Sequence, residues 1–209
     1  VYNNLIVVGK KHADDQQGHY RYLHRNRYNK HELLPIGEFV PFEEILRPIA
    51  PLFDLDHSSF TRGEAKQANL IANGYHVLPA ICYEIAFSSL VRGNYQQDSD
   101  ILFTVSNDAW FGNSHGPHQH MQIARMRALE LGMPLVRVTN NGVSGVYDPI
   151  AKHGQYLPQF EAALERFSLP LTTGKTFYSQ YGDRALYIAL LLCFIASLIT
   201  QRQKQKSMP

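Results

Sequence analysis

An uncharged apolar run near the C-terminus constrains this chain more than any other feature of its sequence. Between Arg184 and Arg202 the residues read ALYIALLLCFIASLITQ, without a single charge. As a helix, this run reaches the short end of the length that crosses the hydrocarbon core of a bilayer. A buried core helix is the alternative, but the flanking residues favour a transmembrane helix over residues 185–201.

The residues on both sides of this run have the composition of membrane interfaces. Aromatic side chains lie toward its N-terminal end, at Tyr178, Tyr181 and Tyr187. Basic side chains follow it, at Arg202, Lys204 and Lys206. Tyrosines form belts at membrane surfaces, and basic residues mark the cytoplasmic side. We therefore predict a basic cytoplasmic tail over residues 202–209 and a domain over residues 1–180 on the other side of the membrane.

The composition of the chain is that of a folded domain. It has 209 residues, of which 44% are hydrophobic and 18% charged, with a formal net charge of +2. This composition excludes a disordered chain, and so small a charge gives no argument for a nucleic-acid-binding protein.

Apolar runs of strand length alternate with helical patterns. Met121, Ala124, Ala128 and Leu131 share one face at helical spacing before Gly132, which predicts a helix within residues 115–134. We expect strands within residues 3–10 (buried), 76–84, 100–108 and, on both sides of a turn, 134–149, with a loop or exposed hairpin within 11–30 and a short helix within 37–50. The pattern predicts an α/β, or layered α+β, fold.

The segment LPAICYEIAF places Cys82 at the end of an apolar run, directly before Tyr83 and Glu84. Side chains at the end of a buried strand often line sites. A cysteine nucleophile also needs a nearby base or cation, and a lone cysteine in a strand is more often inert core. Taken alone, Cys82 leaves both interpretations open. A disulfide with Cys193, the other cysteine, is not expected because Cys193 lies in the apolar run.

Three further groups of polar residues are candidates for a site. Lys30 could support a cysteine thiolate or a developing oxyanion, and Glu38 follows a glycine, although solvated loop charges are the ordinary alternative. Asn107 and Trp110 follow the strand expected within residues 100–108 and could line a pocket. Three histidines, His115, His118 and His120, match no zinc spacing, so we expect hydrogen bonding and no metal.

Taken in order, these segments resemble one family. They are YNKHELLPIGEFVPFE, AICYEIAF, SNDAWFG, QHMQIARMRALELGMPLVRVTNNGVSGV and the terminal apolar run. Together they resemble the apolipoprotein N-acyltransferases, bacterial inner-membrane enzymes of the nitrilase, or carbon–nitrogen hydrolase, superfamily. The motifs around Lys30 and Cys82 are typical of the superfamily. Three further features point to the acyltransferases: the extension after Gly37, the Trp110 loop and the terminal run.

The resemblance implies an αββα sandwich that faces the periplasm and transfers acyl groups. Cys82 would be the nucleophile and carry a fatty acyl chain, taken from a phospholipid, as a thioester. Lys30 would stabilise the oxyanion, Glu38 and Glu84 would support the site, and Tyr83 would lie beside the nucleophile. The acceptor would be the N-terminal diacylglyceryl-cysteine of an apolipoprotein. No metal or organic cofactor is implied.

The resemblance also has a gap. The family uses a third catalytic residue, a glutamate that acts as general base, and no position of this chain matches it. Glu38 and Glu84 match other family positions and do not replace it. We therefore expect the chain to be the C-terminal portion of such an enzyme, with a sandwich incomplete at its N-terminus and without activity by itself.

Two other functions are compatible with parts of the sequence. A membrane-tethered nitrilase-type amidase or hydrolase would use the same Cys82 and Lys30 but transfer the acyl group to water. A membrane-anchored interaction module without catalysis would explain the unmatched glutamate. The terminal apolar run and the order of the motifs favour the acyltransferase.

Overall fold

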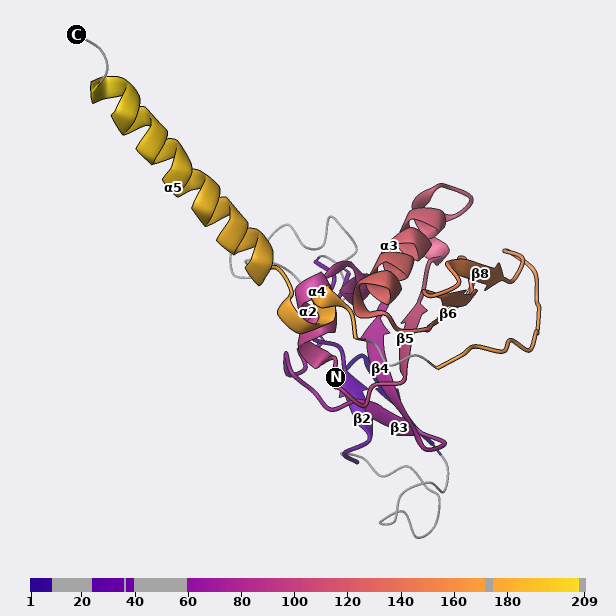
Figure 1. Cartoon of the computed structure of the whole chain (residues 1–209). Coiled ribbons are helices and arrows are strands. Elements are labelled where there is room, and N and C mark those ends of the chain that lie inside the picture. Colours follow the sequence, from indigo (N-terminus) through magenta and orange to yellow (C-terminus); the bar gives the residue numbers. More distant parts are fainter. Residues whose placement is uncertain (9–23, 36, 40–59, 172–174, 207–209) are drawn as a thin grey trace, which may run out of the picture.

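A six-stranded mixed sheet forms the centre of the molecule (Figure 1). The computed structural model describes residues 1–8, 24–35, 37–39, 60–171 and 175–206. The strands lie in the order β3 (Leu70–Ala72), β4 (Tyr75–Ile81), β5 (Ile101–Ser106), β6 (Leu135–Thr139), β7 (Gly145–Asp148) and β8 (His153–Tyr156). β4, β5 and β6 are parallel, while β3, β7 and β8 each run antiparallel to their preceding or following neighbour.

A small antiparallel sheet of β1 (Asn4–Ile6) and β2 (Arg27–Asn29) packs on one face of the large sheet. The contact is an apolar cluster in which Tyr28 of β2 meets Leu70 of β3 and Ile81 of β4. Helices α2 (Ser88–Asn94) and α3 (Gly116–Leu131) cover the opposite face. The described residues therefore form three layers of the expected sandwich: helices, large sheet and small sheet.

Side-chain alternation along β4 explains why both faces of the large sheet are covered. Leu78 and Ala80 point into the helix-side core, whereas Val77 and Ile81 face the small sheet. Successive side chains of a strand point to opposite faces, so an apolar run without alternation requires cover on both sides. The strand ends at Ile81, and Cys82 is the first residue beyond it.

Helix α3 confirms the helical pattern of its sequence. Met121, Ala124, Ala128 and Leu131 are its buried apolar face and pack in the helix-side core. Gly132 ends the helix with φ of 67°, a left-handed conformation that glycine adopts at little steric cost. The strands expected around Cys82, before Asn107 and on both sides of the turn at residues 140–142 are confirmed as β4, β5, β6 and β7.

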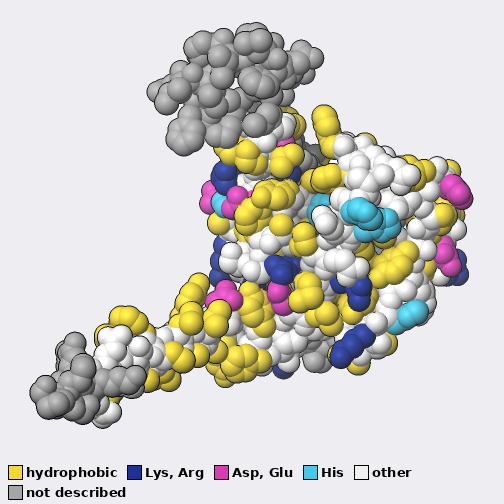
Figure 2. All heavy atoms as spheres, turned by 90° about the horizontal axis from the view of Figure 1, so that it is seen from above, with side chains coloured by type: hydrophobic (Ala, Val, Ile, Leu, Met, Phe, Trp, Pro, Cys, Tyr) yellow, Lys and Arg dark blue, Asp and Glu magenta, His cyan; other side chains and the backbone are white. Residues whose placement is uncertain are grey.

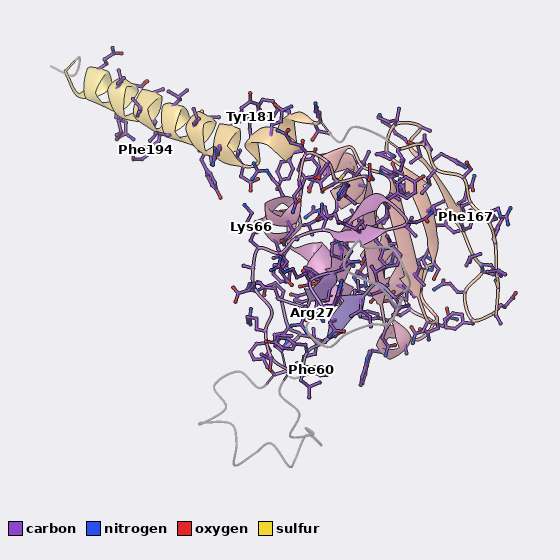
Figure 3. The ribbon with its side chains drawn as sticks, turned by 90° about the horizontal axis from the view of Figure 1, so that it is seen from below. Arg27, Phe60, Lys66, Phe167, Tyr181 and Phe194 are labelled. Atoms are coloured by element: carbon purple, nitrogen blue, oxygen red, sulfur yellow. The ribbon has the colours of Figure 1, made fainter. Side chains whose placement is uncertain are left out.

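Helix α5 (Arg184–Lys206) projects from the body of the molecule, beyond the short helix α4 (Phe177–Tyr181) (Figures 1 and 2). Its residues 184–201 have a mean hydropathy of 1.8, are long and apolar enough to cross a membrane, and bury none of their surface in the molecule. Figure 3 shows Phe194 on this projecting arm, far from the sheets, with Tyr181 at its base. The alternative of a core helix packed within the described chain is therefore wrong.

Two sequence expectations near the N-terminus are wrong in part. The strand expected to be buried within residues 3–10 is only Asn4–Ile6. Leu5 and Val7 pack toward the large sheet, whereas Ile6 and Val8 are on the other side and are exposed. Of the loop or exposed hairpin expected within residues 11–30, residues 11–23 lie outside the described residues. Its last residues include β2, whose Tyr28 is buried, and Lys30 behind it is buried too. Most of residues 37–50, where a helix was expected, lie outside the described residues.

The hairpin of β3 and β4 was not predicted, although its turn residues indicate it. Asn73-Gly74 joins β3 to β4, with φ of 53° and 85° at the two residues. Asn-Gly is the preferred pair for two-residue hairpin turns that need positive φ at both positions. The strand β3 could have been found from this pair.

The packing predicts a large difference between two leucines. Leu102 of β5 is 0% exposed at the centre of the helix-side core, and Leu164 is 99% exposed. We expect Leu102→Ala to lower the free energy of unfolding by about 2–5 kcal/mol, because it leaves a cavity. Leu164→Ala should change it by less than about 0.5 kcal/mol. Urea unfolding followed by circular dichroism measures both, and equal losses would contradict the packing.

Candidate active site

Cys82 lies in an unusual backbone conformation at the end of β4. Its φ is 55°, in the left-handed region that residues with a side chain rarely adopt, and it begins the short 3₁₀ helix η2 (Cys82–Ala86). The residue is half-buried and its thiol is free. A disfavoured conformation of this kind costs about 1–3 kcal/mol and persists only where the surroundings hold it.

Glu84 helps to stabilise the left-handed conformation of Cys82. Its side chain is buried, and its Oε2 accepts a hydrogen bond from the Ile81 backbone N–H at 2.8 Å, directly before Cys82. Its Oε1 accepts from the hydroxyl of Tyr28 at 3.0 Å. The backbone N–H groups of His31 and Glu32 donate to the same oxygen at 2.6 and 3.2 Å. One carboxylate thus ties the Cys82 turn to the segment that contains Lys30.

Burial is the main influence on the pKa values of Glu84 and Tyr28. It raises the pKa of Glu84 above its ordinary value, against the effect of the hydrogen bonds from Ile81, His31, Tyr28 and Glu32. Burial and the charge of Glu84 also raise the pKa of Tyr28, so its hydroxyl remains a donor. Both carboxylate oxygens of Glu84 are occupied as acceptors, which makes it a structural group.

Lys30 and Glu38 form a buried ion pair. The Nζ of Lys30, a residue only 1% exposed, lies 2.6 Å from Oε2 of Glu38. Glu38 also accepts from the Leu34 backbone N–H and the Asn3 side chain, each at 2.7 Å. Although burial alone would raise it, these hydrogen bonds and the charge of Lys30 lower the pKa of Glu38. The pair holds the ammonium group of Lys30 in one place, and the solvated-loop alternative for Lys30 is wrong.

The other predicted residues lie around this centre in different ways. Tyr83 is half-exposed and its ring packs edge-on against Phe87, with ring centroids 4.9 Å apart. Asn107 joins two loops, because its Oδ1 accepts from the Asn140 side chain at 2.5 Å. Trp110, on the 3₁₀ turn η3 (Ala109–Phe111), is 86% exposed. Trp110 is therefore presented at the surface of the described residues.

The three histidines do not act together. His115 and His118 are exposed, whereas His120 contacts both Asp108 and the Cys82 backbone. Among the residues that the structure describes, no group of three or more His, Cys, Asp or Glu is arranged to hold a metal ion.

Sequence reasoning missed three buried residues of this site: Tyr28, Asp108 and Arg137. Asp108 and Arg137 form an ion pair at 2.8 Å, with both side chains 0% exposed. The periodicity of the strands gives no indication of the pair, because Arg137 lies within β6 and Asp108 lies in the loop that follows β5. A charged residue within the apolar run of β6 was the one available indication of Arg137.

The comparison with known proteins assigns the chain to a family. Residues 1–164 match the carbon–nitrogen hydrolase family. A free cysteine at the end of a central strand, a buried lysine paired with a glutamate, and sheets layered with helices accompany this match. The chain belongs to the carbon–nitrogen hydrolase family.

The similar curated proteins carry a more specific name. The chain is 50% identical to an apolipoprotein N-acyltransferase of Photobacterium profundum, over 97% of this chain and 38% of that protein. It is 53% identical to one of Vibrio vulnificus, over 91% of this chain and 37% of the relative. It is 52% identical to an apolipoprotein N-acyltransferase of Shewanella oneidensis, over 98% of this chain and 40% of that protein. The chain thus spans about two fifths of the length of these relatives.

The acceptor geometry of Glu84 leads to a prediction. In Glu84→Gln, the amide nitrogen must face either the Ile81 N–H or the three donors at Oε1, so at least one donor loses its partner. We expect the free energy of unfolding to fall by about 1–3 kcal/mol, measured by urea unfolding. Glu161→Gln, at an exposed position, is the matched control and should be near neutral. Equal stability of both variants would contradict a structural role for Glu84.

Proposed function

We propose that this chain carries the nucleophile of an apolipoprotein N-acyltransferase. The acyl donor is a phospholipid, and the acceptor is the α-amino group of the diacylglyceryl-cysteine at the start of an apolipoprotein. The observation that carries the proposal is the free, half-buried Cys82, held in a left-handed turn beside the segment of the buried Lys30–Glu38 pair. The names of its relatives support the substrate classes.

The proposed reaction has two acyl transfers. In the first, the Cys82 thiolate attacks the ester carbonyl carbon, the C–O bond breaks, and the lysophospholipid leaves as an alcohol after taking up a proton. In the second, the acceptor amine attacks the thioester carbonyl, the C–S bond breaks, and the amide forms as the amine loses a proton to restore the thiol. A covalent intermediate divides one difficult transfer into two easier ones.

Lys30 is the proposed partner of the oxyanion in both steps. Its ammonium group is buried and already fixed by Glu38, so it need not be ordered when charge develops on the carbonyl oxygen. Glu38 and Glu84 are committed to Lys30 and to backbone donors, respectively. Neither is therefore proposed as the general base that the reaction requires.

The proposed membrane arrangement follows from α5. We propose that residues 185–201 cross the bacterial inner membrane, with residues 1–180 in the periplasm and residues 202–209 in the cytoplasm. An acyl donor dissolved in the bilayer must be met at its surface, and a helix that leaves the domain directly would hold it there. The exposed rings of Tyr181 and Tyr187 suit the interface.

The catalytic proposal is tested on the protein expressed from its complete reading frame. Cys82→Ser should form no acyl adduct with phospholipid, because the hydroxyl is a weaker nucleophile. Lys30→Ala should stay folded by circular dichroism but acylate at least ~100-fold more slowly, since it lacks the oxyanion partner. Intact-mass spectrometry after mixing with phospholipid measures both.

Cys193→Ala, on the projecting helix, is the matched control and should acylate normally. Wild-type acylation in Lys30→Ala would contradict the oxyanion role, and an acyl adduct that persists in Cys82→Ser would contradict the nucleophile. Release of the acyl chain to water at the same rate with and without an apolipoprotein would indicate the hydrolase alternative.

The topology is tested with single cysteines in a Cys82→Ala, Cys193→Ala background. Ser168→Cys, at an exposed position of the domain, should react with a membrane-impermeant maleimide in spheroplasts. Ser207→Cys, beyond α5, should react only after lysis, because charged tails of this kind stay in the cytoplasm. The reverse pattern would contradict the orientation, and labelling of both before lysis would contradict the crossing.

A further inference from the structure

A buried charged cluster lies behind the Cys82 turn, and the proposed reaction does not use it. Asp108 follows β5, Arg137 lies on β6, and His120 lies near the start of α3. The side chains of Asp108 and Arg137 are 0% exposed, and that of His120 is 11% exposed. Three elements of the fold thus place charged groups at one point.

Asp108 is the centre of this cluster. Its Oδ1 accepts from the Ser106 hydroxyl at 2.6 Å and lies 3.1 Å from Nδ1 of His120. Its Oδ2 accepts from Nη2 of Arg137 at 2.8 Å. Burial opposes the charge, but these hydrogen bonds and the charge of Arg137 lower the pKa of Asp108 to about 2. The carboxylate is therefore an acceptor only, and Nδ1 of His120 must carry a proton to bond to it.

The other ring nitrogen of His120 faces the nucleophile. Its Nε2 lies 3.2 Å from the backbone carbonyl oxygen of Cys82. A carbonyl oxygen also only accepts, so this contact needs a proton on Nε2 as well. The ring thus lies between two acceptors, the Asp108 carboxylate and the Cys82 carbonyl oxygen, and bridges them.

Charged and titratable groups of three elements lie around His120. Asp108 at the end of β5 bonds its ring directly, and Arg137 of β6 lies behind Asp108. Cys82 lies on its other side, at the start of η2. Burial lowers the pKa of Arg137, and the charge of Asp108 and its hydrogen bond to the guanidinium act against this effect.

The Cys82 turn is consequently held on both sides. Glu84 binds the N–H of Ile81 before the nucleophile, and His120 binds the carbonyl of the nucleophile itself. The left-handed φ of Cys82 needs such support, because the chain would otherwise relax toward an ordinary conformation and turn the side chain away.

We propose that His120 is a positioning residue for the nucleophile: held by Asp108 and Arg137, its ring fixes the Cys82 carbonyl and thereby the direction of the Cys82 thiol. This inference rests on the role of Cys82 in the proposed function. It assigns to the Asp108–His120–Arg137 cluster a positioning role toward Cys82 in addition to its contribution to stability.

The test replaces His120 by Gln or Asn, whose side-chain amide nitrogen takes the place of one of the two ring nitrogens. The nitrogen of Gln reaches the position of Nε2 and can still donate to the Cys82 carbonyl, whereas that of Asn reaches the position of Nδ1 and meets only Asp108. The variants are His120→Gln and His120→Asn, in the full protein with Cys193→Ala. The matched control is His118→Gln, at an exposed position on the same helix.

The first readout is the rate at which iodoacetamide alkylates Cys82, followed by peptide mass spectrometry, together with the free energy of unfolding. We expect His120→Asn to react about tenfold or more slowly and His120→Gln to stay within about threefold of the parent, because only Gln keeps the contact. His118→Gln should match the parent. Equal rates in all three variants, or an equal loss in Gln and Asn, would overturn the proposal, since a merely structural histidine gives no preference for Gln.

The second readout separates this inference from the proposed function. The acyl-transfer rate should fall in His120→Asn through kcat, with KM unchanged, because the lost contact is to the Cys82 backbone and orients the thiol for the chemical step. Alkylation that depends on His120 in a protein that forms no acyl adduct would support the inference and refute acyl transfer. An acyl adduct that forms equally fast in every variant would support acyl transfer and overturn the inference.

Discussion

The buried carboxylate of Glu84 is the interaction on which the rest of the site depends. It accepts hydrogen bonds from residues 52 to 56 positions earlier in the chain and from Ile81 beside the nucleophile. A buried carboxylate is stable only when its oxygens accept hydrogen bonds. The four hydrogen bonds to Glu84 therefore depend on one another. The small sheet, which carries Lys30 behind β2, is therefore held against the strand that ends at Cys82.

Glu38 and Glu84 have identical side chains, but their environments give them different roles in the site. Glu38 pairs with a buried ammonium group, and its pKa is lowered. Glu84 is more deeply buried, accepts its hydrogen bonds from a hydroxyl and from backbone N–H groups, and its pKa is raised. The first fixes a charge that the proposed chemistry would use, and the second fixes the backbone that presents the nucleophile. Neither has an oxygen left over for proton transfer, which is consistent with a general base from another residue.

Local patterns predicted the elements of the fold, but not the contacts between them. The buried face of α3, the strand before Cys82 and the strands around the turn at Asn140 follow from periodicity and turn residues, and the structure contains them. Burial of Lys30 could not be found in the same way, because its polar neighbours in sequence suggest solvent and only the fold brings Glu38 to its ammonium group. The Asp108–Arg137 pair was missed for the same reason, since Asp108 follows β5 and Arg137 lies on β6. Family resemblance singled out Cys82 and Lys30, where spacing alone left them ambiguous.

A rigid nucleophile and an exposed periphery suit the proposed substrates. The Cys82 backbone is bound on both sides by buried groups, so the entropy of ordering it is lost when the protein folds and not when a substrate arrives. The aromatic rings of Trp110, Phe111 and Tyr83, in contrast, are exposed, as is the whole apolar surface of α5. In the proposed reaction, a phospholipid and a lipidated protein would use one thiol in turn, and the two molecules share little beyond long acyl chains. Precise geometry is needed only at the carbonyl carbon, where both reactions occur, while the surroundings need apolar surface that adapts to either molecule. The division between a fixed turn and exposed rings is what such a sequence of reactions requires.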